Sequence, residues 1–218
     1  KSIYNRDTDA RNNLYRAFLY ACSPAAWGVQ LVFDNKVILG TRARKTRTKS
    51  FNAFSSIDYP ETAVFRDMRL IPFLQRPAAL PPVRFYDRLN PAVFVLRLIP
   101  GMRADIIPLL APHYRALVVE SFGVGGLPGG EQGPMYRELQ RWCDSGRLAV
   151  FTTQVPHEGS DLAVYEVGRA AKELDGVLEA RDMTPEATAV KLMWALGQSN
   201  DRAEVIRLFR RPVEWDTV

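Results

Sequence analysis

Hydrophobic positions early in the chain change from the spacing of a helix to that of strands. In residues 8–22, TDARNNLYRAFLYAC, apolar side chains recur on one helical face, at Ala10, Leu14, Ala17, Phe18 and Ala21. Residues 29–40, VQLVFDNKVILG, then form β-rich runs on both sides of Asp34-Asn35-Lys36. We therefore expect a helix followed by a β-hairpin or a strand with a tight turn.

From residue 92 onwards, strand-like and helix-like patterns alternate regularly. Apolar runs predict strands at residues 92–98, 116–121, 148–155 and 176–180. Helices are predicted in the segments MRADIIPLLA, MYRELQRWCDSG, one ending near Asp175, TPEATAVKLMWALGQ and DRAEVIRLFRR. Thr184 is expected to cap the helix that begins at Pro185. This alternation favours a parallel sheet with helices on both faces.

The region between these two parts has a weaker pattern. Periodicity fades over residues 58–91, and prolines cluster in RPAALPPVRFYDRLNP. We place a linker at residues 76–90, between a first domain at residues 1–75 and a second at 91–218. Ligands bind beyond the carboxyl ends of strands in parallel sheets, which makes SFGVGGLPGG and QVPHEGSD candidate site loops.

Positive charge is concentrated in one short segment. The chain has a formal charge of +5, but residues 35–57 hold six cations and no acid, so the remainder sums to −1. Most of these cations lie in TRARKTRTKSF, at Arg42, Arg44, Lys45, Arg47 and Lys49. Three interpretations are open: a nucleic-acid footprint, a solvated loop, or the surroundings of one proton-carrying lysine. The lack of interleaved aromatic residues disfavours stacking on single-stranded nucleic acid.

Other kinds of chemistry find little support in the sequence. The only cysteines are Cys22 and Cys143 and the only histidines His113 and His157, at spacings that suggest no disulfide framework, zinc site or Ser-His-Asp arrangement. The glycine-rich loop lacks a nucleotide-binding motif, and no apolar run reaches the roughly 18 residues of a membrane span. We expect no cofactor, no metal and a reducing, cytoplasmic setting.

Several segments together resemble the L-asparaginase family, in particular its cytoplasmic bacterial type I branch. They follow the family order and cover nearly all of the chain: SIYNRDTDARNNLYRAFLYA, VILGTRARKTRTKSFNAFSS, LIPGMRADII, VVESFGVGGLP, TTQ, YEVGRA and DMTPEATAVKL. The resemblance implies an α/β chain with the asparaginase/glutaminase fold. It would comprise the later part of a parallel-sheet amino-terminal domain and a smaller, three-layer α/β carboxyl-terminal domain.

The resemblance also implies an amidohydrolase that converts L-asparagine to L-aspartate and ammonia through a threonine nucleophile. A hydroxyl must be activated by a base, and the family uses a second threonine, an aspartate and a lysine for this purpose. Gly40 and Phe51 set the register that matches this lysine to Lys45. The family's T-G-G-T and T-D-T motifs are absent from these 218 residues. We therefore expect that the nucleophile lies outside the chain and that the chain alone is an incomplete enzyme.

Substrate contacts and partners follow from the same resemblance. Family members complete each site with a loop from a neighbouring subunit, which implies a homodimer or homotetramer and neither nucleic acid nor membrane as a partner. SFGVGGLP resembles that loop, with Gly126 where many relatives carry Asn, and Tyr165 matches a position near the site, although a core or interface tyrosine is the alternative. Two rival functions stay open: the related subunit that releases ammonia for tRNA-dependent amidation, and a non-catalytic binding module of the same fold.

Overall fold

The computed structural model describes residues 1–79, 82–130, 133–164 and 166–218. The chain forms two compact units, Lys1–Arg84 and Phe85–Val218, and the boundary between them falls within the proline-rich segment. Each unit has a hydrophobic core of its own. No helix in the described part of the chain is long and apolar enough to cross a membrane.

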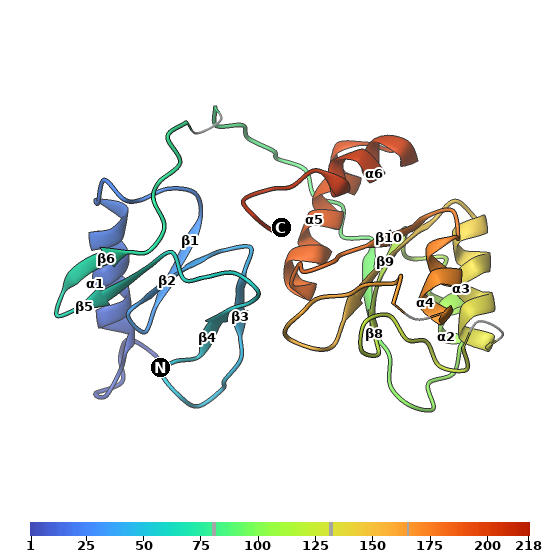
Figure 1. The fold of residues 1–218 in the computed structure, drawn as a ribbon, viewed down its shortest axis with the longest axis horizontal. Coiled ribbons are helices and arrows are strands. Elements are labelled where there is room, and N and C mark those ends of the chain that lie inside the picture. Colours follow the sequence, from blue (N-terminus) through green and yellow to red (C-terminus); the bar gives the residue numbers. More distant parts are fainter. Residues whose placement is uncertain (80–81, 131–132, 165) are drawn as a thin grey trace. The chain divides into compact units, whose positions relative to one another are not determined.

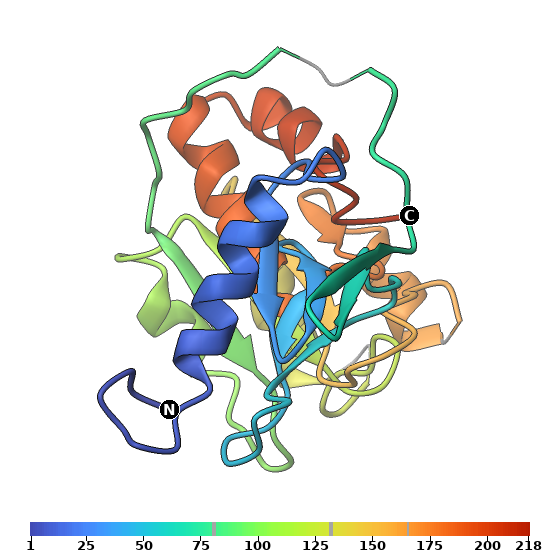
Figure 2. The same cartoon turned by 90° about the vertical axis from the view of Figure 1, so that its left-hand side faces the viewer.

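The first unit combines one helix with short strands (Figure 1). Its elements are α1 (Ala10–Ala21), β1 (Gln30–Phe33), β2 (Lys36–Leu39), β3 (Ala43–Lys45), β4 (Phe54–Ser56), β5 (Ala63–Arg66) and β6 (Arg69–Pro72). Four strands form a sheet in the order β1-β2-β5-β6, and β3 pairs with β4. Helix α1 lies beside the first of these sheets (Figure 2), and its Tyr20 shares a core with Val37, Ala63 and Phe65.

Two-residue turns explain the antiparallel pairing of this unit. Asp34 and Asn35 join β1 to β2 with φ of 46° and 65°, and Asp67 and Met68 join β5 to β6 with φ of 47° and 65°. Positive φ at both turn positions matches the twist of a hairpin, whereas parallel strands need a long crossover. The predicted hairpin at residues 29–40 is confirmed. The strand pairs described in this unit are all antiparallel. Parallel strand pairs are found in the second unit.

The second unit is built around a parallel sheet. Its strands are β7 (Val93–Arg97), β8 (Ala116–Ser121), β9 (Leu148–Thr153) and β10 (Val177–Glu179), in the spatial order β10-β9-β8-β7. Its helices are α2 (Ile106–Leu110), α3 (Pro134–Asp144), α4 (Glu166–Lys172), α5 (Pro185–Gln198) and α6 (Arg202–Arg210). The predicted α/β class is confirmed. The expected cap is present as well, because Thr184 Oγ1 accepts a hydrogen bond from Ala187 N at 3.1 Å.

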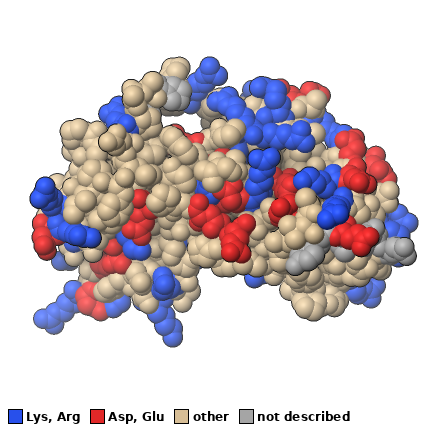
Figure 3. All heavy atoms as spheres, in the orientation of Figure 1, with Lys and Arg blue, Asp and Glu red and all other residues tan. Residues whose placement is uncertain are grey.

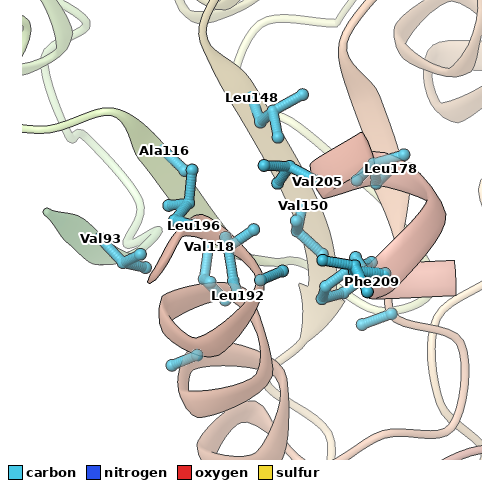
Figure 4. Packing of buried hydrophobic residues seen from close by; sticks show 14 of the residues in the cluster. Val93, Ala116, Val118, Leu148, Val150, Leu178, Leu192, Leu196, Val205 and Phe209 are labelled. Atoms are coloured by element: carbon cyan, nitrogen blue, oxygen red, sulfur yellow. The ribbon is translucent and has the colours of Figure 1, made fainter. Parts of the chain in front are cut away.

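Helices cover both faces of this sheet, which gives the predicted three layers (Figure 1). On one face, Val118 and Val150 pack against Leu192, Leu196 and other residues of α5 and α6 (Figure 4). On the opposite face, the alternate strand residues Leu117, Val119, Ala149 and Phe151 pack against α2, α3 and α4. Strands β8 and β9 are therefore buried along their whole length, as near-continuous apolar runs predict for parallel strands.

Candidate functional site

Lys45 lies at the end of β3, where it pairs with Phe54 of β4. The loop between these strands is closed by the amides of Thr46 and Arg47, which donate to the carbonyl of Ala53 at 2.8 and 3.2 Å. The Lys45 side chain is exposed, and no residue in the described part of the chain forms a hydrogen bond or ion pair with its amine. The hairpin thus fixes the backbone of Lys45 and leaves the amine accessible to a reacting group.

The cations around Lys45 differ in their surroundings. Arg42 is fully buried, its guanidinium carbon lies 5.4 Å from the centre of the Tyr59 ring, and its carbonyl accepts from Ile57 N at 3.0 Å. Arg47 is exposed and donates to the carbonyl of Asn52 at 3.2 Å. Arg42 therefore ties the segment before β3 to the segment that follows β4. The basic segment is therefore not exposed to solvent along its whole length.

The surface charges also bear on the nucleic-acid interpretation. Lys36, the first cation of the basic region, is paired with Glu61 at 2.7 Å. Figure 3 shows Lys and Arg side chains interspersed with Asp and Glu over the face that it draws. A nucleic-acid footprint is typically a basic stripe or patch on one face. At Lys36, the pairing with Glu61 reduces the net positive charge that the basic region presents.

Asn13 gives the beginning of α1 a structural role. Its buried side-chain amide donates to Asp9 Oδ2 at 3.0 Å, and its Oδ1 accepts from the backbone amide of Asp34 at 3.0 Å. Asp34 lies in the left-handed turn between β1 and β2. Because Asn13 uses both its donor and its acceptor, it ties the helix start to this turn. These contacts place the Asp9-to-Asn13 segment in the framework of the first unit.

The two loops predicted as site candidates lie together at the carboxyl end of the parallel sheet. SFGVGGLPGG follows β8, and QVPHEGSD follows β9. Thr153 Oγ1 donates to the carbonyl of Gly123 at 2.6 Å, and the amide of Asp161 donates to the carbonyl of Val124 at 2.9 Å. The two loops therefore support each other and form one continuous surface of the second unit.

Gly126 closes a narrow turn within this surface. Its amide donates to the carbonyl of Phe122 at 2.7 Å, and its carbonyl accepts from the amide of Phe122 at 3.1 Å. A Cβ at position 126 would lie 3.2 Å from the Phe122 carbonyl oxygen, and one at Gly125 would lie 2.6 Å from Leu162 Cδ2. The glycines thus permit close packing of the turn, and position 126 offers only its backbone to a ligand.

Sequence reasoning missed a polar cluster at the ends of β7, β8 and β9. Gln154 Nε2 donates to the carbonyls of Leu98 and Glu120 at 2.6 and 2.9 Å, which links these three strand ends. The buried Glu120 carboxylate lies 3.3 Å from the Arg97 guanidinium. A signal was present, because Glu120 is a charged residue inside the otherwise apolar strand ALVVE, and buried charges are paired.

The predicted site residues fall in different parts of the chain. Lys45 belongs to the first unit and Gly126 to the second. Tyr165 lies outside the described residues. The structure thus describes the surroundings of Lys45 and of Gly126 separately, and their catalytic and substrate-binding roles stay predictions.

The cysteines and histidines in the described part of the chain differ in their exposure. Burial raises the pKa of the Cys143 thiol to about 12, which makes it a weak nucleophile. Cys22, His113 and His157 are exposed. No group of three or more His, Cys, Asp or Glu residues among those described is arranged to hold a metal ion.

Family models match both parts of the chain. The model of the glutaminase/asparaginase C-terminal domain matches residues 92–209, and the model of the asparaginase N-terminal domain matches residues 1–77. The first of these matches alone includes more than half of the chain.

Curated proteins and solved structures point in the same direction. An L-asparaginase from Thermococcus kodakarensis is 36% identical over 97% of this chain and 63% of its own length. A subunit of the glutamyl-tRNA(Gln) amidotransferase from Pyrococcus furiosus is 33% identical over 92% of this chain and 47% of its own length. The solved thermostable L-asparaginase from Thermococcus kodakarensis superposes with a TM-score of 0.90 and 33% identity over 99% of this chain and 64% of that chain. The chain thus spans less than two thirds of the length of these relatives.

Proposed function

Because the chain belongs to the glutaminase/asparaginase family, we propose that it acts in the hydrolysis of L-asparagine to L-aspartate and ammonia. The observation that carries this proposal is the likeness to L-asparaginase, in sequence and in fold, along nearly the whole chain. The exposed amine of Lys45 on a closed hairpin supports it, because amide hydrolysis requires groups that accept and deliver protons.

In this proposal Lys45 belongs to the proton relay that activates a threonine hydroxyl. The hydroxyl oxygen bonds to the side-chain amide carbon of asparagine and loses its proton to the relay. The amide nitrogen takes up a proton and leaves as ammonia, and water then hydrolyses the acyl-enzyme ester to release aspartate. The nucleophilic threonine is supplied by a segment outside these 218 residues, which contain neither T-G-G-T nor T-D-T.

The glycine-rich loop is the proposed contribution of the second unit to substrate binding. Residues 122–130 lie beyond the carboxyl end of β8, where ligands collect in parallel sheets. Gly126 would act through its carbonyl oxygen, which accepts from the Phe122 amide and has a second lone pair, and Tyr165 is retained as a further substrate-binding candidate. We propose that the loop completes a site across subunits in a homodimer or homotetramer.

The proposed location is the cytoplasm. Neither cysteine forms a disulfide: Cys22 is an exposed free thiol, and Cys143 is a buried one. Free cysteines of this kind are compatible with a reducing compartment.

A second candidate function is supported by the similarity to the amidotransferase subunit. In that case ammonia would be released for amide transfer to tRNA-bound substrate together with a partner subunit. The two functions differ in their dependence on other molecules, since an asparaginase needs only its amino-acid substrate and water.

Ammonia release separates these candidates. The gene product translated from its own start codon is assayed with L-asparagine and with L-glutamine, beside the 218-residue chain as a control. We expect turnover of L-asparagine by the gene product without tRNA and none by the 218-residue chain. Ammonia release that requires tRNA and a partner subunit would replace the proposal by the amidotransferase, and binding of L-asparagine without any turnover would favour a non-catalytic module.

A further inference from the structure

A basic cavity of about 380 Å³ opens at the amino edge of the parallel sheet. The glycine-rich loop lies at the opposite, carboxyl edge of the same sheet. The cavity is lined by polar and charged side chains that include His113, Arg115, Arg147, Asn200 and Arg202. Its volume is within the range of about 300–1,000 Å³ that is usual for small-molecule sites.

The parallel sheet itself brings two of these arginines together. Arg115 directly precedes β8, Arg147 directly precedes β9, and the first residues of these strands, Ala116 and Leu148, are register partners. The amide of Leu148 donates to the carbonyl of Arg115 at 3.4 Å. Parallel neighbouring strands that start at the same level therefore place both arginines at one edge.

The third arginine enters from the beginning of α6. The guanidinium of Arg202 packs over Gly176, just before β10, where a Cβ would lie 2.5 Å from its Nη2 atom. Gly176 has φ of 99°, a conformation that other residues rarely adopt. The glycine thus leaves the space that this guanidinium occupies beside the sheet edge.

The positive charge of the cavity is only partly compensated. Arg115 donates to Asn200 Oδ1 at 2.9 Å, and Arg147 donates to the carbonyls of Ala111 and Tyr114 at 2.8 and 3.3 Å. Neither arginine forms an ion pair with any acid that the structure describes. The residues that line the cavity include no Asp or Glu.

Arg202 is hydrogen-bonded through only one of its nitrogen atoms among the described residues. Asp175 accepts from its Nη1 atom at 2.7 Å, while Nε and Nη2 are buried and have no hydrogen-bond partner among the described residues. A buried donor without a partner is unfavourable. Because these two nitrogen atoms have almost no solvent-accessible surface, Arg202 would act on an anion in the cavity mainly through its positive charge.

We propose that this cavity is a binding site for a small dianion, carrying either a phosphoryl group or two carboxylates. Guanidinium groups recognise both by paired, charge-assisted hydrogen bonds. The apolar side chains of Leu148, Leu196 and Val205, labelled in Figure 4, also line the cavity and would contact a short carbon skeleton. The site is independent of the proposed asparagine hydrolysis.

The two histidines allow a direct binding test on the 218-residue chain. The imidazole proton signals of His113, which lines the cavity, and of His157, which lies in the loop after β9, are followed by NMR during titration with inorganic phosphate and, separately, with succinate at low ionic strength. We expect saturable shifts of the His113 signals and none of the His157 signals. The probe that binds more tightly identifies the phosphoryl or the dicarboxylate class.

Matched variants connect the binding to the arginines. Arg115→Gln and Arg202→Gln should each weaken the affinity by about tenfold or more, because each removes a positive charge from the cavity. Arg211→Gln, at an exposed position outside the cavity, should leave the affinity unchanged. Circular dichroism confirms that each variant is folded. Failure of both probes to shift the His113 signals, or equal affinity of Arg115→Gln and the unaltered chain, would overturn the proposal.

Discussion

Lys191 Nζ lies 2.6 Å from Asp216 Oδ2, and the two side chains are only 6% and 3% exposed. Lys191 belongs to α5, whereas Asp216 lies in the segment after α6. The other carboxylate oxygen of Asp216 accepts from the amide of Val213 at 2.9 Å, and the Lys191 amine also lies 5.5 Å from the centre of the Phe209 ring. This ion pair therefore fixes the segment after α6 against the helices of the second unit.

Removal of the carboxylate charge should destabilise the second unit strongly. Asp216→Asn leaves the buried ammonium of Lys191 without its counter-charge, which costs about 3–5 kcal/mol for pairs of this kind. Urea unfolding followed by circular dichroism measures the loss. The double variant Lys191→Met/Asp216→Leu should recover most of it, because it buries no charge. An unchanged unfolding midpoint for Asp216→Asn would show that the pair has no such role.

The core beneath α5 gives a second prediction. Leu192 is completely buried between α5 and the sheet, whereas Val190 on the same helix is 57% exposed. Leu192→Ala should lower the free energy of unfolding by about 2–5 kcal/mol, because it leaves a cavity. Val190→Ala should change it by less than about 0.5 kcal/mol. Equal effects of the two substitutions in denaturant unfolding would contradict the layer arrangement.

The conformation of the loop after β9 requires a glycine at position 159. Gly159 has φ of 67°, and a Cβ there would lie 2.5 Å from the carbonyl oxygen of Arg181. Gly159→Ala should therefore destabilise the protein by at least about 1 kcal/mol, since alanine is strained at positive φ and would also clash. Gly123→Asn is the matched control, because position 123 has φ of 51° with open space around it, and asparagine tolerates this conformation. Comparison of the thermal unfolding midpoints of the two variants separates the effect of strain from that of simply losing a glycine. A Gly159→Ala variant as stable as Gly123→Asn would refute the proposed clash.

The cysteines should differ in reactivity and in pH dependence. Burial raises the pKa of Cys143 to about 12, above its ordinary value of 9.0, so the thiol stays protonated in the folded chain. Above about pH 9 the unfolded chain loses this proton and the folded chain does not, so the contribution of Cys143 to the free energy of unfolding falls as the pH rises towards 12. At pH 8, an alkylating reagent should modify exposed Cys22 and spare Cys143, which peptide mass spectrometry can measure. Rapid alkylation of Cys143 in the folded chain would disprove its burial.

Much of the second unit could be predicted from the sequence, because its signals are long. Strands β8 and β9 carry unbroken apolar runs, and α5 begins with the strong Thr184-Pro185 cap signal. Strands β3 to β6 were missed. They are three or four residues long and partly polar, and the Asp67-Met68 turn contains no glycine or asparagine. Their pairing depends on neighbouring strands and not on local pattern.

The candidate sites show the same limit. Lys45 was singled out through a resemblance, whereas the charge count around it gave no indication that Arg42 is buried. The three arginines of the amino-edge cavity are far apart in the chain: the parallel pairing of β8 and β9 brings Arg115 and Arg147 together, and the packing of α6 beside Gly176 adds Arg202. Such groups of side chains depend on the order of the strands and on which residues pair between them. A single sequence does not specify either.

The role of Lys45 is tested most directly by ammonia release from L-asparagine. Lys45→Met and Lys49→Met are compared in the gene product translated from its own start codon, because both lysines are exposed cations of the same basic segment. We predict that Lys45→Met lowers kcat by at least about 100-fold, as loss of a general acid–base group does, with an unchanged circular dichroism spectrum and oligomeric state. Lys49→Met should retain nearly full activity. Full turnover by a folded Lys45→Met variant would contradict the account.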